Sequence, residues 1–282
     1  MAATQSHEAS AFPAFALIPG AWHSPSHFDP VTSRLHSAGY STQSLRLPSV
    51  GSPNPEVVST TTDAEFIIKN VLQPLVDSGT DVVFVMHSYG SIPGTAAAVG
   101  LSKADRAAAG LPGGIIGIIL IAAFIVRDGE CCVSGDYPDW AVNNVCLTCD
   151  LSRAIPPSDQ EPIQVTTLDV TADKALSTFY QDVPSSIATE AIAQLLPHSV
   201  NSFTTPTGPT AWDNPAYNDH RAYIRTLQDV PIPLAAQNAM LAGSGVEWDV
   251  RDFDTGHSPF LVKPGELAAT LIELAKAWVR KD

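Results

Sequence analysis

The chain has 282 residues, of which 45% are hydrophobic and only 16% are charged, so it fits one large α/β domain with an insertion, or two small domains, and wholesale disorder is excluded. Its net charge of -14 would make nucleic acid and anionic lipid surfaces repel it, so neither is an expected partner. The longest apolar stretch, residues 113–126, has 14 residues, too few for a membrane-spanning helix, which needs about 20.

The N-terminal segment contains His7 and Glu8 in place of the basic start and continuous apolar block of a secretory signal. We therefore expect a cytoplasmic protein. Residues 15–18 form a short apolar run that ends at Pro19-Gly20, which predicts a buried strand and a tight turn. Helical spacing over residues 28–38 is followed by an extended run over 41–47, so this part of the chain predicts a strand–helix–strand unit.

The next elements continue the alternation of helix and strand. A helix capped by Thr62 or Asp63 is expected to run to Gly79. Residues 82–86 and 115–126 are continuous hydrophobic runs, typical of strands that are buried on both faces of a parallel sheet. An alanine-rich helix is expected between them, over residues 92–101.

The character of the sequence changes after Arg127. Residues 127–215, which we call the insert, are interrupted by prolines and are expected to hold short helices, for example over 171–180 and 186–196. We predict that the insert is a mainly helical cap (lid), and that residues 1–126 and 216–282 form the core.

Four cysteines fall within 19 residues of the insert: Cys131, Cys132, Cys146 and Cys149. Only the spacing of Cys146 and Cys149, with two residues between them, matches one half of a zinc-site pattern. We therefore expect structural thiols in a reducing compartment, or a local disulfide in an oxidising one, and no metal.

Alternation resumes after the insert, with a strand over residues 222–227, a helix over 234–241, a strand over 248–253 and a final amphipathic helix over 266–279. Strands and helices that alternate on both sides of an insertion predict a mostly parallel sheet with helices on both faces.

Ser88 lies in Met86-His87-Ser88-Tyr89-Gly90, where an apolar strand turns into a helix. A serine at such a turn is held above the sheet edge and is a candidate nucleophile, although serine is also a common helix cap. The usual pattern has a small residue where Met86 stands. His87 is expected on the opposite side of the turn, in a packing role.

His257 follows the last predicted strand, and Asp229 follows the strand before it. An imidazole at this sheet edge could take the proton of Ser88, and a carboxylate could orient that imidazole. The order Ser, Asp, His is that of the α/β-hydrolases. Three other acids, which we expect to be solvated charges or caps, are alternatives to Asp229: Asp249, Asp252 and Asp254.

The first loop, Gly20-Ala21-Trp22-His23, allows close approach of a ligand to the backbone. The amides of Ala21 and Tyr89 are the expected donors to an oxyanion. Trp22, His23 and, in the insert, His198 are candidate substrate contacts. Other aromatic side chains could line an apolar cleft or belong to the core: Trp140, Phe179, Tyr180, Phe203 and Trp212.

Four motifs together resemble the α/β-hydrolase superfamily, and within it the group of plant methyl esterases, hydroxynitrile lyases and related fungal enzymes. These motifs are LIPGAWHSPSHF, MHSYGS, LQDVPIPLAAQNAM and TGHSPFLVKP. The resemblance implies an α/β-hydrolase fold, with Ser88, Asp229 and His257 at catalytic positions and Ala21 and Tyr89 as oxyanion donors. Hydroxynitrile lyases of this group generally place Lys after the catalytic His, where this chain has Ser258, which disfavours cyanogenic activity.

We therefore expect a serine hydrolase that cleaves a small to medium hydrophobic ester or lactone through an acyl-enzyme, with no cofactor. Two alternatives stay open. One is cleavage of a carbon–carbon bond, by hydrolysis or by a retro-aldol type lyase step of secondary metabolism. The other is a ligand-binding relative without turnover. A homodimer also stays open, because the sequence does not bear on assembly.

Overall fold

A parallel six-stranded sheet forms the centre of the computed structural model, which describes residues 12–132 and 167–280. The strand order is β2-β1-β3-β4-β7-β8, and every neighbouring pair is parallel. The carboxyl ends of all six strands therefore lie at one edge. The strands are β1 (Ala14–Ile18), β2 (Thr42–Ser44), β3 (Asp81–His87), β4 (Gly114–Ile121), β7 (Arg221–Thr226) and β8 (Asp249–Phe253).

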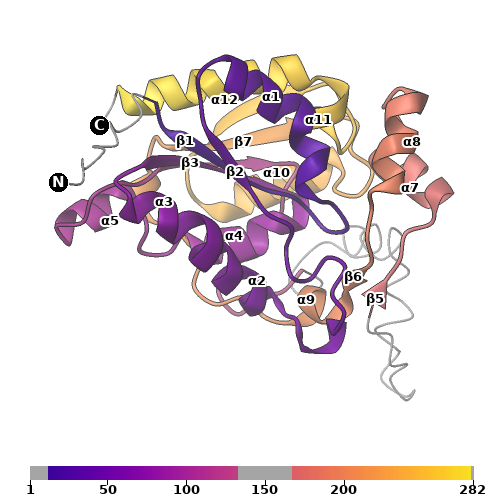
Figure 1. Ribbon diagram of the computed structural model, residues 1–282, viewed down its shortest axis with the longest axis horizontal. Coiled ribbons are helices and arrows are strands. Elements are labelled where there is room, and N and C mark those ends of the chain that lie inside the picture. Colours follow the sequence, from indigo (N-terminus) through magenta and orange to yellow (C-terminus); the bar gives the residue numbers. More distant parts are fainter. Residues whose placement is uncertain (1–11, 133–166, 281–282) are drawn as a thin grey trace, which may run out of the picture.

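Helices cover both faces of this sheet (Figure 1). One face carries α1 (Asp29–Ser37), α11 (Pro259–Val262) and α12 (Pro264–Val279). The opposite face carries α2 (Thr60–Ile67), α3 (Gln73–Asp77), α4 (Ser91–Ala97) and α5 (Lys103–Ala108). A further helix, α10 (Leu234–Ser244), connects β7 to β8. The prediction of a mostly parallel sheet between two helical layers is confirmed.

Two predicted boundaries are wrong for identifiable reasons. Ser59, and neither Thr62 nor Asp63, caps α2: its side chain accepts a hydrogen bond from the Thr62 amide, while Asp63 is fully buried. β4 ends at Ile121, because Ala122 has a φ of 45° and turns the chain out of the strand. Residues 122–126 are nevertheless buried, so their apolar character reflects burial outside a strand.

The helices and strands of the described part of the insert lie beyond the carboxyl edge of the sheet (Figure 1), and residues 211–214 run back to contact α4 and α5. It contains the two-stranded antiparallel pair β5 (Thr167–Leu168) and β6 (His198–Ser199), and the helices α7 (Ala172–Phe179), α8 (Ser185–Ala193) and α9 (Val200–Thr204). Buried side chains of these elements belong to the same hydrophobic cluster as the sheet. The division into a core and a cap stays a prediction, of which residues 133–166 lie outside the described residues.

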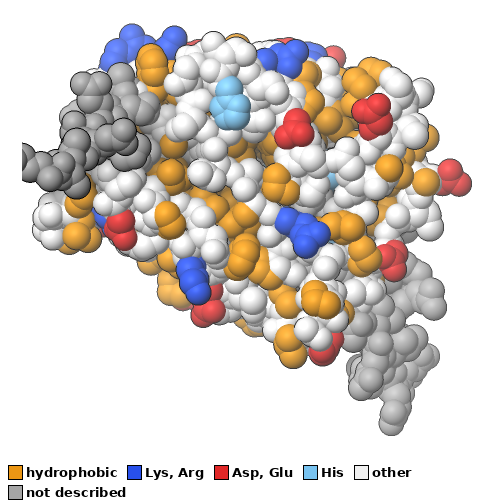
Figure 2. Space-filling view, in the orientation of Figure 1, with side chains coloured by type: hydrophobic (Ala, Val, Ile, Leu, Met, Phe, Trp, Pro, Cys, Tyr) orange, Lys and Arg blue, Asp and Glu red, His pale blue; other side chains and the backbone are white. Residues whose placement is uncertain are grey.

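Basic side chains on the face shown in Figure 2 stand apart from one another, several with acidic side chains beside them. Elsewhere in the described residues, ion pairs such as Lys103–Asp81 and Arg251–Asp249 also join basic and acidic side chains. In the described parts of the chain, no helix is both long enough and apolar enough to cross a bilayer.

Candidate active site

Ser88 occupies a strained turn between β3 and the helical segment that leads into α4. Its φ of 51° lies in the left-handed region, which costs an L-residue about 1–2 kcal/mol. Two glycines make this turn possible. A Cβ at Gly20 would lie 2.9 Å from the Ser88 Cβ, and one at Gly90 would lie 2.9 Å from the Ile18 carbonyl oxygen and still closer to that of Pro19. The backbone thus presents the Ser88 hydroxyl at the carboxyl edge of the sheet.

Met86, which stands where a small residue is usual, is accommodated by a glycine on the next helix. Its side chain is fully buried, and a Cβ added to Gly94 would lie 2.5 Å from the Met86 Sδ. The missing side chain at Gly94 therefore provides the space that Met86 fills. The departure from the usual pattern leaves the turn at Ser88 intact.

His257 and Asp229 form a buried pair beside this turn. The Nδ1–H of His257 donates to Asp229 Oδ2 at 2.8 Å. The same oxygen accepts from the Thr226 hydroxyl at 2.6 Å, and Asp229 Oδ1 accepts from the Ile232 amide at 2.7 Å. The carboxylate is thus fixed by three donors, and the Nε2 of His257 is left with a lone pair for a further proton.

The alternative acids lie elsewhere. On the edge strand β8, Asp249 pairs with Arg251, and Asp252 pairs with Arg225 of the neighbouring β7. Asp254 accepts from the Gln228 side chain. These three carboxylates are therefore engaged away from His257.

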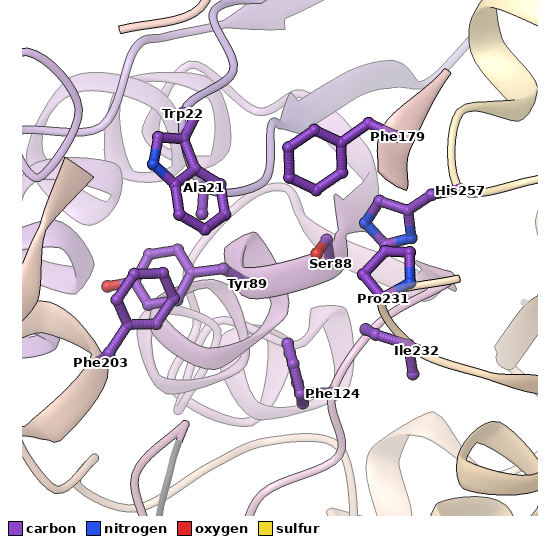
Figure 3. Close-up of a pocket in the computed structure, with 10 residues that line it drawn as sticks. All are labelled: Ala21, Trp22, Ser88, Tyr89, Phe124, Phe179, Phe203, Pro231, Ile232 and His257. Carbon is purple, nitrogen blue, oxygen red and sulfur yellow. The ribbon is translucent and has the colours of Figure 1, made fainter. Parts of the chain in front are cut away.

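Ser88 and His257 both line one small pocket, with a cavity volume of about 30 Å³, and their side chains enter it from different loops (Figure 3). The other lining residues are Ala21, Trp22, Tyr89, Phe124, Phe179, Phe203, Pro231 and Ile232. Within the described residues no hydrogen bond joins the Ser88 hydroxyl to His257. Such catalytic contacts are often long before a substrate is bound. The walls are apolar and largely aromatic, which suits an uncharged hydrophobic ligand.

The amides of Ala21 and Tyr89 belong to the two loops that flank Ser88. In the described chain the Ala21 amide donates to no protein acceptor. Tyr89 lies in the first turn of the helical segment, where amides lack intrahelical acceptors. Both residues line the pocket, so two unengaged donors are available there to a developing negative charge.

His23 and His198, predicted as substrate contacts together with Trp22, lie one layer behind the pocket wall. Trp22 lines the pocket, but neither histidine does. The His23 Nδ1–H donates to the Ala21 carbonyl at 2.6 Å, and its Nε2 accepts from the Tyr180 hydroxyl at 2.9 Å. The His198 ring packs against Tyr89 and contacts the Ser202 hydroxyl at 2.8 Å. Burial lowers the pKa of His198 to about 3.

A buried carboxylate that the sequence analysis did not assign to the site lies behind Tyr89. The Tyr89 hydroxyl donates to Asp63 Oδ2 at 2.8 Å, and burial raises the pKa of Asp63 to about 6. The sequence could have indicated that Asp63 is buried, because it precedes the apolar Ile67 by one helical turn and therefore lies on the same, buried face of α2.

His87 points to the far side of the turn, as expected. Its Nε2 lies 3.0 Å from the His257 carbonyl oxygen, and its ring packs against those of His257 and Phe260. Desolvation by burial lowers the pKa of His87 well below its ordinary value. His87 is therefore a neutral ring that supports the loop carrying His257.

Of the four cysteines, Cys131 and Cys132 are described and are buried. Cys146 and Cys149, and the candidate cleft residue Trp140, lie in residues 133–166, outside the described residues. In residues 12–132 and 167–280, no group of three or more His, Cys, Asp or Glu side chains could hold a metal ion.

Comparisons with known proteins cover nearly the whole chain. Residues 15–270 match the alpha/beta hydrolase family. The alpha/beta hydrolase nvfD of Aspergillus novofumigatus is 30% identical over 259 residues, which are 89% of this chain and 92% of the relative. A pyrethroid hydrolase from Sphingobium faniae shares the fold with a TM-score of 0.69 at 20% identity, over 94% of this chain and 98% of the other. Methylesterase MES16 from Arabidopsis does so with a TM-score of 0.67 at 19% identity, over 94% and 99%.

Proposed function

The chain belongs to the alpha/beta hydrolase family, and from this premise we propose that it is a serine hydrolase that cleaves a carboxylic ester or lactone through an acyl-enzyme. One observation carries the proposal: the His257–Asp229 pair, with its hydrogen bond of 2.8 Å, shares a pocket with Ser88 on its strained turn. The fold by itself would not assign a reaction, because one fold hosts many chemistries.

In the proposed reaction, the Ser88 Oγ attacks the carbonyl carbon while the Nε2 of His257 takes the hydroxyl proton. Asp229 keeps His257 in the tautomer that leaves Nε2 free, and stabilises the imidazolium that forms. The negative charge moves to the carbonyl oxygen, where the amides of Ala21 and Tyr89 would receive it.

Collapse of this intermediate breaks the bond to the leaving oxygen, which takes the proton from His257 and departs as the alcohol. His257 then takes a proton from water, whose oxygen attacks the acyl carbon of the ester on Ser88. The acid is released and Ser88 regains its proton. In this scheme the chain's own side chains carry every proton.

The pocket favours a hydrophobic and uncharged substrate. The ten residues that line it include no Asp, Glu, Lys or Arg, and the aromatic rings of Trp22, Phe179 and Phe203 form much of the wall. The methylesterase and pyrethroid hydrolase with the same fold support an ester as the bond that is cleaved.

Labelling with a fluorophosphonate, followed by mass spectrometry of the peptides, tests the nucleophile. We expect one adduct, on the peptide that contains Ser88, and none in Ser88→Ala. Chromogenic acyl esters test turnover, with a burst followed by a steady rate as the expected course. Labelling elsewhere, or no labelling of folded protein, would contradict the proposal.

Two other outcomes would identify the alternatives. A carbon–carbon bond-cleaving enzyme that uses Ser88 only for binding would retain substantial activity in Ser88→Ala. A binding protein without turnover would bind the ester analogue and release no product.

A further inference from the structure

Four consecutive residues of the insert contact three loops of the candidate active site: the first loop, residues 20–23, the loop that carries Asp229 and the loop that carries His257. These residues, 179–182, end α7 and lead into α8, and we call them the strap. The strap approaches the loops from outside the sheet edge, from a part of the chain that contributes none of the three residues Ser88, Asp229 and His257 (Figures 1 and 3).

Asp182 binds the loop that carries His257. Its Oδ2 accepts a hydrogen bond of 2.6 Å from the Gly256 amide, the residue directly before His257. Gly256 has no room for a side chain on this side: a Cβ there would lie 2.7 Å from Asp182 Oδ1 and still closer to the Gln181 amide group. The close approach of the strap therefore requires glycine at position 256.

Gln181 binds the loop that carries Asp229. Its side-chain amide donates to the Gln228 carbonyl at 2.9 Å, one residue before Asp229. The Gln228 amide in turn donates to the Thr255 carbonyl at 3.0 Å. The acid loop and the base loop are thus joined to each other and, at adjacent residues, to the strap.

Phe179 and Tyr180 contact the first loop. The Tyr180 hydroxyl donates to His23 Nε2, and His23 Nδ1–H donates to the carbonyl of Ala21. The Phe179 ring packs 5.5 Å from the Trp22 ring and 5.8 Å from the His257 ring, measured between centroids. One side of the strap therefore supports the proposed oxyanion loop, while the other supports the proposed acid and base.

We propose that the strap sets the relative positions of the three loops, with Asp182 as the positioning residue for His257. The inference rests on the proposed function, because it assigns the strap a role in catalysis by Ser88 and His257. Hydrogen bonds from outside a site commonly decide whether its reacting groups are held within productive distance. The insert would then complete the active site as well as cover it.

Asp182→Ala removes the acceptor for the Gly256 amide, whereas Asp182→Asn retains an oxygen that can accept. We expect the rate of fluorophosphonate labelling and the kcat for a chromogenic ester to fall roughly 10- to 100-fold in Asp182→Ala, with KM within about twofold of the parent. Asp182→Asn should recover most of the rate. Glu190→Ala is the matched control, because it removes the same charge from an exposed site on α8.

Gly256→Ala tests the same contact from the other side. The added methyl group displaces the strap, so adding Asp182→Ala to Gly256→Ala should lower the rate by less than about twofold more. Hydrogen exchange of the Gly256 amide provides a readout that does not depend on catalysis. It should be faster in Asp182→Ala and close to the parent rate in Asp182→Asn.

The outcomes separate the two proposals. If the parent protein is not labelled at Ser88, the proposed function fails and this inference fails with it. If the parent is labelled, and Asp182→Ala reacts at the parent rate or Asp182→Asn is as slow as Asp182→Ala, the proposed function stands and the positioning role is refuted.

Discussion

Asp63 should make the stability of this protein depend on pH in a direction opposite to that of most carboxylates. The side chain is fully buried. It accepts hydrogen bonds from the Ser49 amide and from the hydroxyls of Ser49 and Tyr89. These donors favour the ionised form, but loss of water around the carboxylate has the larger effect and raises the pKa to about 6 from 3.8.

The sign follows from the proton affinity of the two states. Between about pH 4 and 6 Asp63 is mostly protonated in the folded state and mostly ionised in the unfolded state. The stabilisation from this proton is therefore complete below pH 4 and is lost as the pH rises through 6. A difference of about 2 pKa units, at 1.36 kcal/mol per unit, corresponds to about 3 kcal/mol in total. Because pH 4 already lies just above the unfolded pKa of 3.8, the part lost between pH 4 and pH 8 is about 2 kcal/mol.

Asp63→Asn removes this titration while it keeps the size and polarity of the side chain. The Asn oxygen can accept from the Ser49 amide, and the hydroxyls of Ser49 and Tyr89 can rotate to accept from its NH₂ group. The mutant should therefore gain about 2 kcal/mol relative to the parent between pH 4 and pH 8. Urea unfolding at both pH values measures this, with Asp173→Asn on the exposed side of α7 as the control. A stability difference that does not change with pH would refute the reasoning.

Three further predictions concern folding around the site. Ser88→Gly should be more stable than Ser88→Ala by about 1 kcal/mol in urea unfolding, because only glycine adopts a φ of 51° without strain; equal stabilities would contradict the strained turn. Gly94→Ala should destabilise the parent, but by about 1 kcal/mol less in a Met86→Ala background, because the new Cβ meets the Met86 sulfur; additive effects in a double-mutant cycle would count against this packing. The pKa of His198, about 3, lies below its unfolded value, so this side chain contributes stability above pH 6.5 that is lost as the pH falls. His198→Gln should therefore reduce the loss of stability between pH 7 and pH 4 by about 3 kcal/mol; melting temperatures that decrease equally in both proteins would contradict this prediction.

The sequence predicts the strands well where a continuous apolar run is bounded by turn residues, as at β1 and β3. It overextends β4, because hydrophobicity reports burial and carries no information on φ at Ala122. Residues 122–126 are buried around the pocket, where Phe124 forms part of the wall and its carbonyl accepts from the Ser91 hydroxyl. Four consecutive hydroxyl residues, 59–62, can each cap a helix, so composition alone does not identify Ser59 as the cap of α2.

The candidate site could be predicted where its residues stand in order at the ends of strands, as Ser88, Asp229 and His257 do. The layer behind the pocket could not, because it depends on which side of a loop each ring faces. His23 and His198 illustrate this limit: their positions in the sequence are compatible with either surface of the wall. The contacts of the strap depend on pairs such as Asp182 and Gly256, which are 74 residues apart, and no local pattern encodes such pairs.

The apolar wall also bears on the end of the proposed reaction. An ester enters the pocket uncharged, but the acid formed from it ionises at neutral pH, and the ten lining residues include neither Lys nor Arg to pair with it. An unpaired carboxylate in such surroundings costs several kcal/mol, and a protein with a net charge of -14 adds repulsion. Expulsion of the anion should therefore be rapid, product inhibition weak, and the reverse condensation disfavoured.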